Sequence, residues 1–125
     1  MVWRKYNPNP CGKSVGDCAV RAVSAALGLT WYEAYDLLCA EGRRACDMPS
    51  SDSVSGAVLR SAGFRRYVIP NTCAQCYSAA DFCADHPEGV YVLYFGGHVA
   101  TVVEGKLLDS WNSENETPIF YYRRT

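Results

Sequence analysis

Apolar residues follow two different periods along this chain. In the N-terminal part they recur every three to four positions, which is typical of helices that bury one face. This spacing predicts helices over residues 19–27, 31–41, 53–62 and 78–84. Short runs of β-branched and aromatic residues predict strands over residues 65–69, 90–95, 99–103, 106–111 and 119–122. Helices followed by strands indicate an α+β fold, with N-terminal helices packed on a C-terminal antiparallel sheet.

Cap and turn residues define the ends of the predicted helices. Thr30 and Glu33 have the spacing of a capping box, which starts the second helix. Gly28 and Gly42 are predicted to end the first and second helices, because glycine readily adopts the left-handed conformation found there. The helical period places Arg21 on the polar face of the first helix.

A predicted hairpin brings two polar residues of the second half together. Glu104 and Gly105 are expected to form its two-residue loop. In that register Ala100 lies opposite Asp109, and His98, two residues before Ala100, shares the same face. We therefore expect His98 and Asp109 to be diagonal neighbours within reach of each other.

Composition narrows the possible functions. The chain has 125 residues, of which 49% are apolar and 20% charged, so we expect one folded domain over residues 1–125. A formal net charge of −1 argues against a nucleic-acid-binding surface. No apolar run is long enough to cross a membrane, and no apolar leader is visible. Seven cysteines cannot all pair internally, which together with the missing leader favours the reducing cytoplasm.

Three residues combine into a nucleophilic site. Cys18 lies at the predicted start of the first helix, where the helix dipole favours the thiolate. His98 follows two glycines and is the type of residue that takes a proton from a thiol. Asp109 would accept a hydrogen bond from the imidazole and fix its tautomer. The alternatives are a structural cysteine at a helix start and a hydrogen-bonded histidine at a strand end.

The order and spacing of these residues resemble the papain-like cysteine peptidase superfamily. A cysteine starts a helix, a Gly-His-aliphatic strand follows much later (residues 97–100), and an Asp-Ser-Trp segment (residues 109–111) comes next. The chain is close in size to minimal members such as bacteriocin-leader peptidases and NlpC/P60 amidases. It also resembles small proteins encoded in bacterial and phage genomes. The resemblance implies that Trp111 shields the hydrogen bond between His98 and Asp109.

The family also has an oxyanion-hole glutamine before its nucleophile, and this chain has none there. Asn7 and Asn9 are the nearest side-chain amides, and either one could donate to an oxyanion together with the backbone N–H of Cys18. The alternative role of both asparagines is turn formation, because they alternate with prolines.

The sequence therefore predicts a cysteine peptidase or amidase with a Cys-His-Asp triad, acting on a peptide, isopeptide or related amide without a metal or cofactor. Its partner would be a peptide or protein substrate, with no nucleic acid and no membrane. One alternative is a catalytically silent papain-like module that binds a peptide or partner protein. Another is a zinc-stabilised binding domain built on four cysteines, Cys39, Cys46, Cys73 and Cys76. The Cys73–Cys76 spacing is also compatible with a redox motif or with loop cysteines of no function.

Overall fold

The computed structural model describes residues 1–70 and 73–124. Within them lie four helices: α1 (Cys18–Leu27), α2 (Trp31–Ala45), α3 (Asp52–Ser61) and α4 (Ala79–Asp85). The same residues contain six strands: β1 (Trp3–Lys5), β2 (Phe64–Val68), β3 (Val90–Phe95), β4 (His98–Val103), β5 (Lys106–Asp109) and β6 (Phe120–Arg124). The predicted α+β class is confirmed. None of the described helices has the length and apolar character needed to span a membrane.

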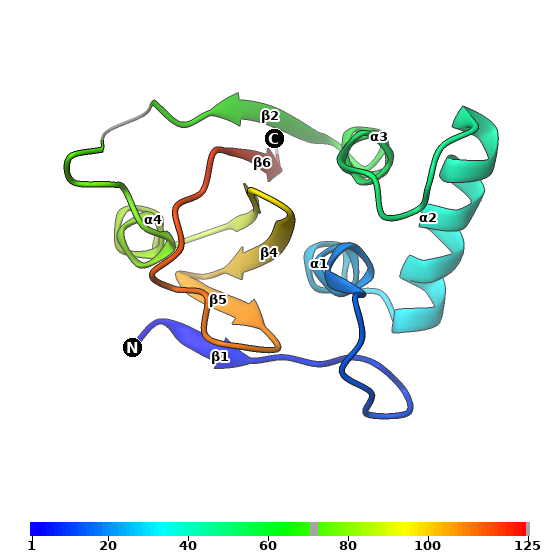
Figure 1. The fold of residues 1–125 in the computed structure, drawn as a ribbon, viewed down its shortest axis with the longest axis horizontal. Coiled ribbons are helices and arrows are strands. Elements are labelled where there is room, and N and C mark those ends of the chain that lie inside the picture. The colour runs from blue at the N-terminus through cyan, green and yellow to red at the C-terminus, as the bar shows by residue number, and fades with distance from the viewer. Residues whose placement is uncertain (71–72, 125) are drawn as a thin grey trace.

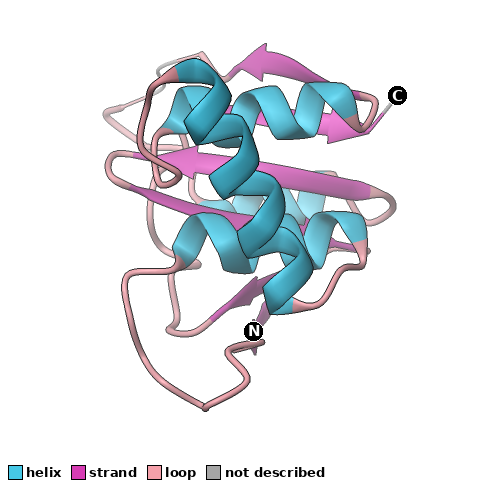
Figure 2. Ribbon diagram, turned by 90° about the vertical axis from the view of Figure 1, so that its right-hand side faces the viewer, coloured by secondary structure: helices cyan, strands magenta, loops and turns pink. Residues whose placement is uncertain are grey.

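The six strands form one mixed sheet with the order β1-β5-β4-β3-β6-β2. Helices α1, α2 and α3 cover one face and α4 covers the other, so the fold has three layers (Figures 1 and 2). Alternation along β3 divides the core accordingly. Val92 and Tyr94 pack with the three N-terminal helices, whereas Tyr91 and Leu93 pack with α4.

Strand β1 is a correction to the predicted sheet. It runs parallel to β5, with Trp3 opposite Leu107 and Lys5 opposite Asp109, so the prediction of a wholly antiparallel sheet is wrong at this pair. Three residues are too few to show an alternating pattern, which is why the sequence did not predict this strand. Its position matters for the site, because β1 lies directly beside the strand that ends in Asp109 (Figure 1).

The hairpin of β4 and β5, which places Asp109 near His98, was predicted correctly. Glu104 and Gly105 both have positive φ, 49° and 73°, as a two-residue type I′ loop requires. The pairs Thr101–Leu108, Val102–Leu107 and Val103–Lys106 have the predicted register. Residues 96–97 form the loop before β4 and bring His98 opposite Phe95, at the first position of the strand.

Helix α1 packs against β4 and thereby brings its N-terminal end to the start of that strand. Its apolar face is buried through Ala19, Val23 and Ala26. The fully buried Thr101 of β4 donates a hydrogen bond of 2.7 Å to the backbone carbonyl of Ala22. This contact fixes where α1 lies along β4, and therefore where Cys18, the first residue of α1, lies relative to His98, the first residue of β4.

Helix α2 extends one turn beyond the predicted end at Gly42. It ends at Ala45, with Cys46 in the left-handed conformation (φ 55°) as its C-cap. Gly42 is instead a buried helical residue against which the chain folds back. A Cβ at this position would lie 2.8 Å from the carbonyl oxygen of Asp47 and 3.2 Å from the nitrogen of Pro49. The glycine thus permits a close backbone approach rather than a helix stop.

Replacing Gly42 by alanine is expected to lower the free energy of unfolding by about 1–3 kcal/mol, because the added methyl group meets backbone atoms that cannot rotate away. In an open helix position the same change would stabilise the protein by about 1 kcal/mol. Urea denaturation followed by circular dichroism measures whether the free energy of unfolding falls or rises. A stabilised variant would contradict the close approach of Asp47 to this helix.

Candidate active site

Cys18 is the first residue of α1 and is half-buried. Asp17 precedes it in the N-cap position, and aspartate there usually accepts hydrogen bonds from the first helical N–H groups. Here its side chain makes no such cap and is used elsewhere. The backbone N–H of Cys18 has no intrahelical acceptor, since it belongs to the first turn. It is therefore free to donate to a bound group beside the thiol.

The thiol of Cys18 lies close enough to the His98 imidazole and the backbone N–H of Val99 for both groups to act on its pKa. The hydrogen bond with His98 lowers the pKa of Cys18, burial opposes that effect, and the Val99 N–H supports it. The result is a pKa below the ordinary thiol value. The predicted meeting of the first helix with the start of a later strand is what the structure shows.

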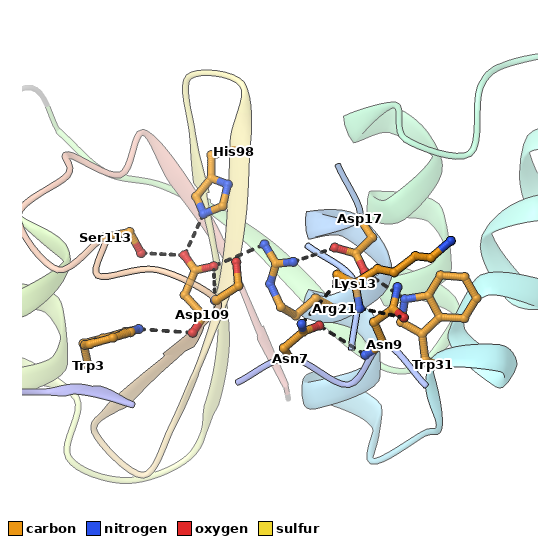
Figure 3. Close-up of polar contacts among 11 residues, drawn as sticks. Trp3, Asn7, Asn9, Lys13, Asp17, Arg21, Trp31, His98, Asp109 and Ser113 are labelled. Carbon is orange, nitrogen blue, oxygen red and sulfur yellow. Dashed lines mark hydrogen bonds and ion pairs between the residues drawn. The ribbon is translucent and has the colours of Figure 1, made fainter. Parts of the chain in front are cut away.

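His98 uses its two ring nitrogens for two different partners. Its Nε2 lies 2.6 Å from Oδ2 of Asp109 (Figure 3). Nδ1 is therefore the ring nitrogen that remains available to the nearby thiol of Cys18. Burial alone would lower the pKa of His98. The hydrogen bonds to Asp109 and Cys18 outweigh it and raise the pKa to about 9. With the thiol pKa lowered and the imidazole pKa raised, the pair favours thiolate and imidazolium.

Asp109 is the most enclosed member of the group, with no solvent exposure. Besides His98, its side chain accepts hydrogen bonds from the Ser113 hydroxyl at 2.6 Å and the Ser110 N–H at 2.8 Å. Burial would raise the pKa of Asp109, but these hydrogen bonds, with that of His98 the strongest, hold it below the ordinary value. Its backbone carbonyl accepts from the Trp3 indole at 3.1 Å. Both the side chain and the main chain of Asp109 are therefore fixed.

Arg21 is a further member of this group that the sequence analysis did not assign to it. The predicted polar face of the first helix is buried here, and Arg21 is only 5% exposed. Its Nη2 lies 3.2 Å from Oδ1 of Asp109, and its Nη1 lies 2.7 Å from Oδ1 of Asp17 (Figure 3). The indole N–H of Trp31 donates to the other Asp17 oxygen at 2.9 Å. The i, i+4 spacing of Asp17 and Arg21 was the available indication of an ion pair.

Trp111 lies beside the histidine, as predicted. Its ring centroid is 5.0 Å from that of His98, with a 42° angle between the planes. Trp111 is 45% exposed, so one side of its indole covers the imidazole and the other side of the indole meets solvent. This position is compatible with shielding of the bond between His98 and Asp109.

The structure places Asn7 and Asn9 in the loop between β1 and α1, where their side chains form turns. The Asn7 amide donates to the carbonyl of Lys13 at 3.2 Å. The Asn7 carboxamide oxygen accepts from the Asn9 N–H, and that of Asn9 accepts from the Cys11 and Lys13 N–H groups. The side-chain N–H of Asn7 is thus already bonded within the loop. These contacts match the turn-forming role that was the alternative to an oxyanion hole. The Cys18 N–H is the predicted oxyanion donor that the helix geometry leaves free.

The cysteines proposed for zinc are not brought together. Cys73 and Cys76 form a disulfide bond, Cys39 lies half-buried on α2, and Cys46 is exposed at its end. Within residues 1–70 and 73–124, no three His, Cys, Asp or Glu side chains are grouped so as to hold a metal ion. The four-thiolate arrangement is therefore wrong for this structure.

An apolar pocket adjoins the start of α1 on the side of α2. It has a volume of about 370 Å³ and is lined chiefly by Gly16, Ala19, Trp31, Tyr35 and Leu38. Trp31 and Tyr35 stack with their centroids 4.9 Å apart. A larger cavity of about 690 Å³, with His86 in its wall, lies at the start of β3, away from the end that adjoins His98. None of the predicted site residues lines it.

No protein-family model, curated protein or solved structure matches this chain. What the site can do chemically is therefore argued from its own groups. A thiol with a lowered pKa, a histidine between it and a buried carboxylate, and a free N–H at a helix start are the components of nucleophilic attack on a carbonyl.

Proposed function

We propose that the protein is a thiol hydrolase of papain-like architecture that cleaves a peptide or a related amide through an acyl-enzyme intermediate. The observation that carries this proposal is the position of His98, which lowers the pKa of the nearby Cys18 thiol and is held at 2.6 Å by the buried Asp109. The position of the nucleophile at a helix start and of the base on a later strand supports the papain-like comparison.

In the proposed reaction the Cys18 thiolate attacks the carbonyl carbon and a C–S bond forms. The negative charge that develops on the carbonyl oxygen is met by the Cys18 N–H. When the tetrahedral intermediate collapses, the C–N bond breaks and the His98 imidazolium gives its proton to the departing amine. Water then attacks the thioester with His98 as base, releasing a carboxylic acid and restoring the thiolate–imidazolium pair.

Asp109 has a positioning role in this scheme. It accepts the Nε2 hydrogen of His98 and stabilises the positive ring, which keeps Nδ1 directed at the thiol. An amine acceptor in place of water would give a transferase, and the same groups would serve it. A free nucleophilic thiol persists under reducing conditions, so we propose a cytoplasmic setting for the reaction, in which the Cys73–Cys76 disulfide would be open to reduction.

The proposal predicts an unusual pH dependence of Cys18 alkylation. An ordinary thiol reacts about 100-fold faster at pH 8 than at pH 6, because its thiolate fraction rises through that range. Cys18, with its pKa lowered by His98, is expected to change much less over the same range. At pH 6 its rate should exceed that of an ordinary thiol because more of it is thiolate, although a lower pKa also makes the thiolate less nucleophilic. Brief iodoacetamide labelling and peptide mass spectrometry measure each cysteine separately.

The internal references and controls are available in the same chain. Cys11 and Cys46 are exposed, and burial raises the pKa of Cys83 to about 11, so these cysteines give comparison slopes. His98→Ala should give Cys18 the steep pH dependence of an ordinary thiol, whereas His86→Ala, which changes the other histidine, should leave its profile flat. A steep profile in the wild type would contradict an activated thiol and favour the peptide-binding module.

A further inference from the structure

We infer that Arg21 is a positioning residue that ties the nucleophile helix to the carboxylate of Asp109 and keeps Cys18 reactive. This inference rests on the proposed thiol hydrolase function. Arg21 lies one helical turn after Cys18 on α1, and its guanidinium reaches Asp109 at the end of β5. The same turn of helix therefore supplies the nucleophile and holds the residue that orients the base.

The two oxygens of Asp109 have separate partners. Oδ1 accepts from Arg21 at 3.2 Å and from the Ser110 N–H at 2.8 Å. Oδ2 accepts from His98 and from Ser113, both at 2.6 Å. Rotation of the carboxylate would break all four contacts. Arg21 thus fixes the oxygen that the histidine does not use, and this keeps the other oxygen directed at the imidazole.

Charges alternate along the group. Asp17, Arg21, Asp109, His98 and Cys18 alternate between negative and positive when the thiolate–imidazolium pair forms. The cation of Arg21 also favours the Cys18 thiolate directly, because its positive charge lowers the pKa of that thiol. The alternation explains how several ionised groups share a largely buried region, since each charge has an opposite neighbour.

A planar guanidinium suits this role better than an ammonium group. Arg21 directs two different nitrogens at two carboxylates, Nη1 at Asp17 and Nη2 at Asp109. Lysine carries the same charge on a single nitrogen and cannot reproduce this fork. Arg21→Lys therefore separates the fixed geometry from the charge.

The test is the pH profile of Cys18 alkylation in folded variants, with melting temperature as the measure of folding. Arg21→Lys is expected to raise the ratio of the rates at pH 8 and pH 6 at least about threefold above the wild-type ratio. Arg21→Gln, which keeps an amide donor without the charge, is the second variant and should give at least the same increase. Asp17→Asn weakens the other ion pair of Arg21 but leaves its contact with Asp109, so its ratio should rise less than that of either Arg21 variant.

Arg60→Lys is the matched control for the loss of a guanidinium elsewhere, since Arg60 donates to the Tyr122 hydroxyl at 2.9 Å. Its profile should match that of the wild type. Flat profiles in both folded Arg21 variants would overturn the inference and leave the proposed function standing. An equal increase in Asp17→Asn would also overturn it, because general loosening of the buried group would then explain the change. A steep wild-type profile would overturn the proposed function, and this inference with it.

Discussion

Replacing Asp109 by alanine is expected to lower the free energy of unfolding by about 3–5 kcal/mol, the typical cost of removing one partner from a buried ion pair. The change leaves the buried Arg21 cation facing an empty space and deprives Ser113 and His98 of their acceptor. Arg21 and Ser113 are themselves buried, so water compensates poorly for the lost acceptor. Urea denaturation at pH 7 gives the free energy from the midpoint and slope.

An exposed ion pair is the control for this prediction. Glu41 and Arg44 on α2 are in contact on the surface, where water replaces a lost partner. Glu41→Ala should therefore shift the urea midpoint much less than Asp109→Ala does. Equal shifts for the two variants would contradict the buried, charged state of Asp109. Ser113→Ala, which removes a single hydrogen bond to the carboxylate, is expected to fall between them at about 1.5–3 kcal/mol.

The meeting of His98 and Asp109 could be predicted from the sequence because it depends on local rules. A two-residue loop of Glu104 and Gly105 fixes the hairpin register, and the register determines which side chains share a face. Cys18 was placed at a helix start by the apolar stripe that follows it. The contact between Cys18 and His98 depends on packing between distant segments. Only the resemblance to a known order of residues indicated it.

The role of Arg21 could not be predicted, because it depends on how α1 packs in three dimensions. Periodicity places an arginine on the polar face of a helix, and a polar face normally meets water. Here that face lies against the end of β5, and two carboxylates replace the water. Asp17 shows the same conflict in its side chain, which bonds Arg21 and Trp31 instead of capping α1. Such departures from a local rule are expected at functional sites.

The last turn of α2 and the short strand β1 were not predicted, for a related reason. Gly42 has the sequence properties of a helix stop. In the structure its missing side chain instead lets the backbone of residues 47–49 pack closely against α2. Trp3–Lys5 forms a strand because β5 offers it a free edge. In both cases a partner far along the chain decides the local structure, and single-sequence patterns do not contain that partner.

Hydrolysis of a small activated ester is expected to show the largest change in activity. With p-nitrophenyl acetate, the wild-type protein should release a burst of about one p-nitrophenol per chain as Cys18 is acetylated, followed by slower turnover. His98→Ala should slow the turnover after the burst by about 10²–10⁴-fold, because the attack of water on the thioester loses its positioned general base. Stopped-flow absorbance measures the burst, and mass spectrometry of the digested protein locates the acetyl group.

The choice of ester makes this experiment independent of the natural substrate, because p-nitrophenolate departs without a proton and needs no specificity pocket. Other thiols can also react, and Cys11 and Cys46 are exposed. Cys18→Ala retains both, so the burst that remains in this variant is their contribution and is subtracted. A burst of unchanged size in Cys18→Ala would assign the acylation to another group. It would contradict Cys18 as the nucleophile even if its alkylation profile were flat, because a stable thiolate is not by itself a catalytic one.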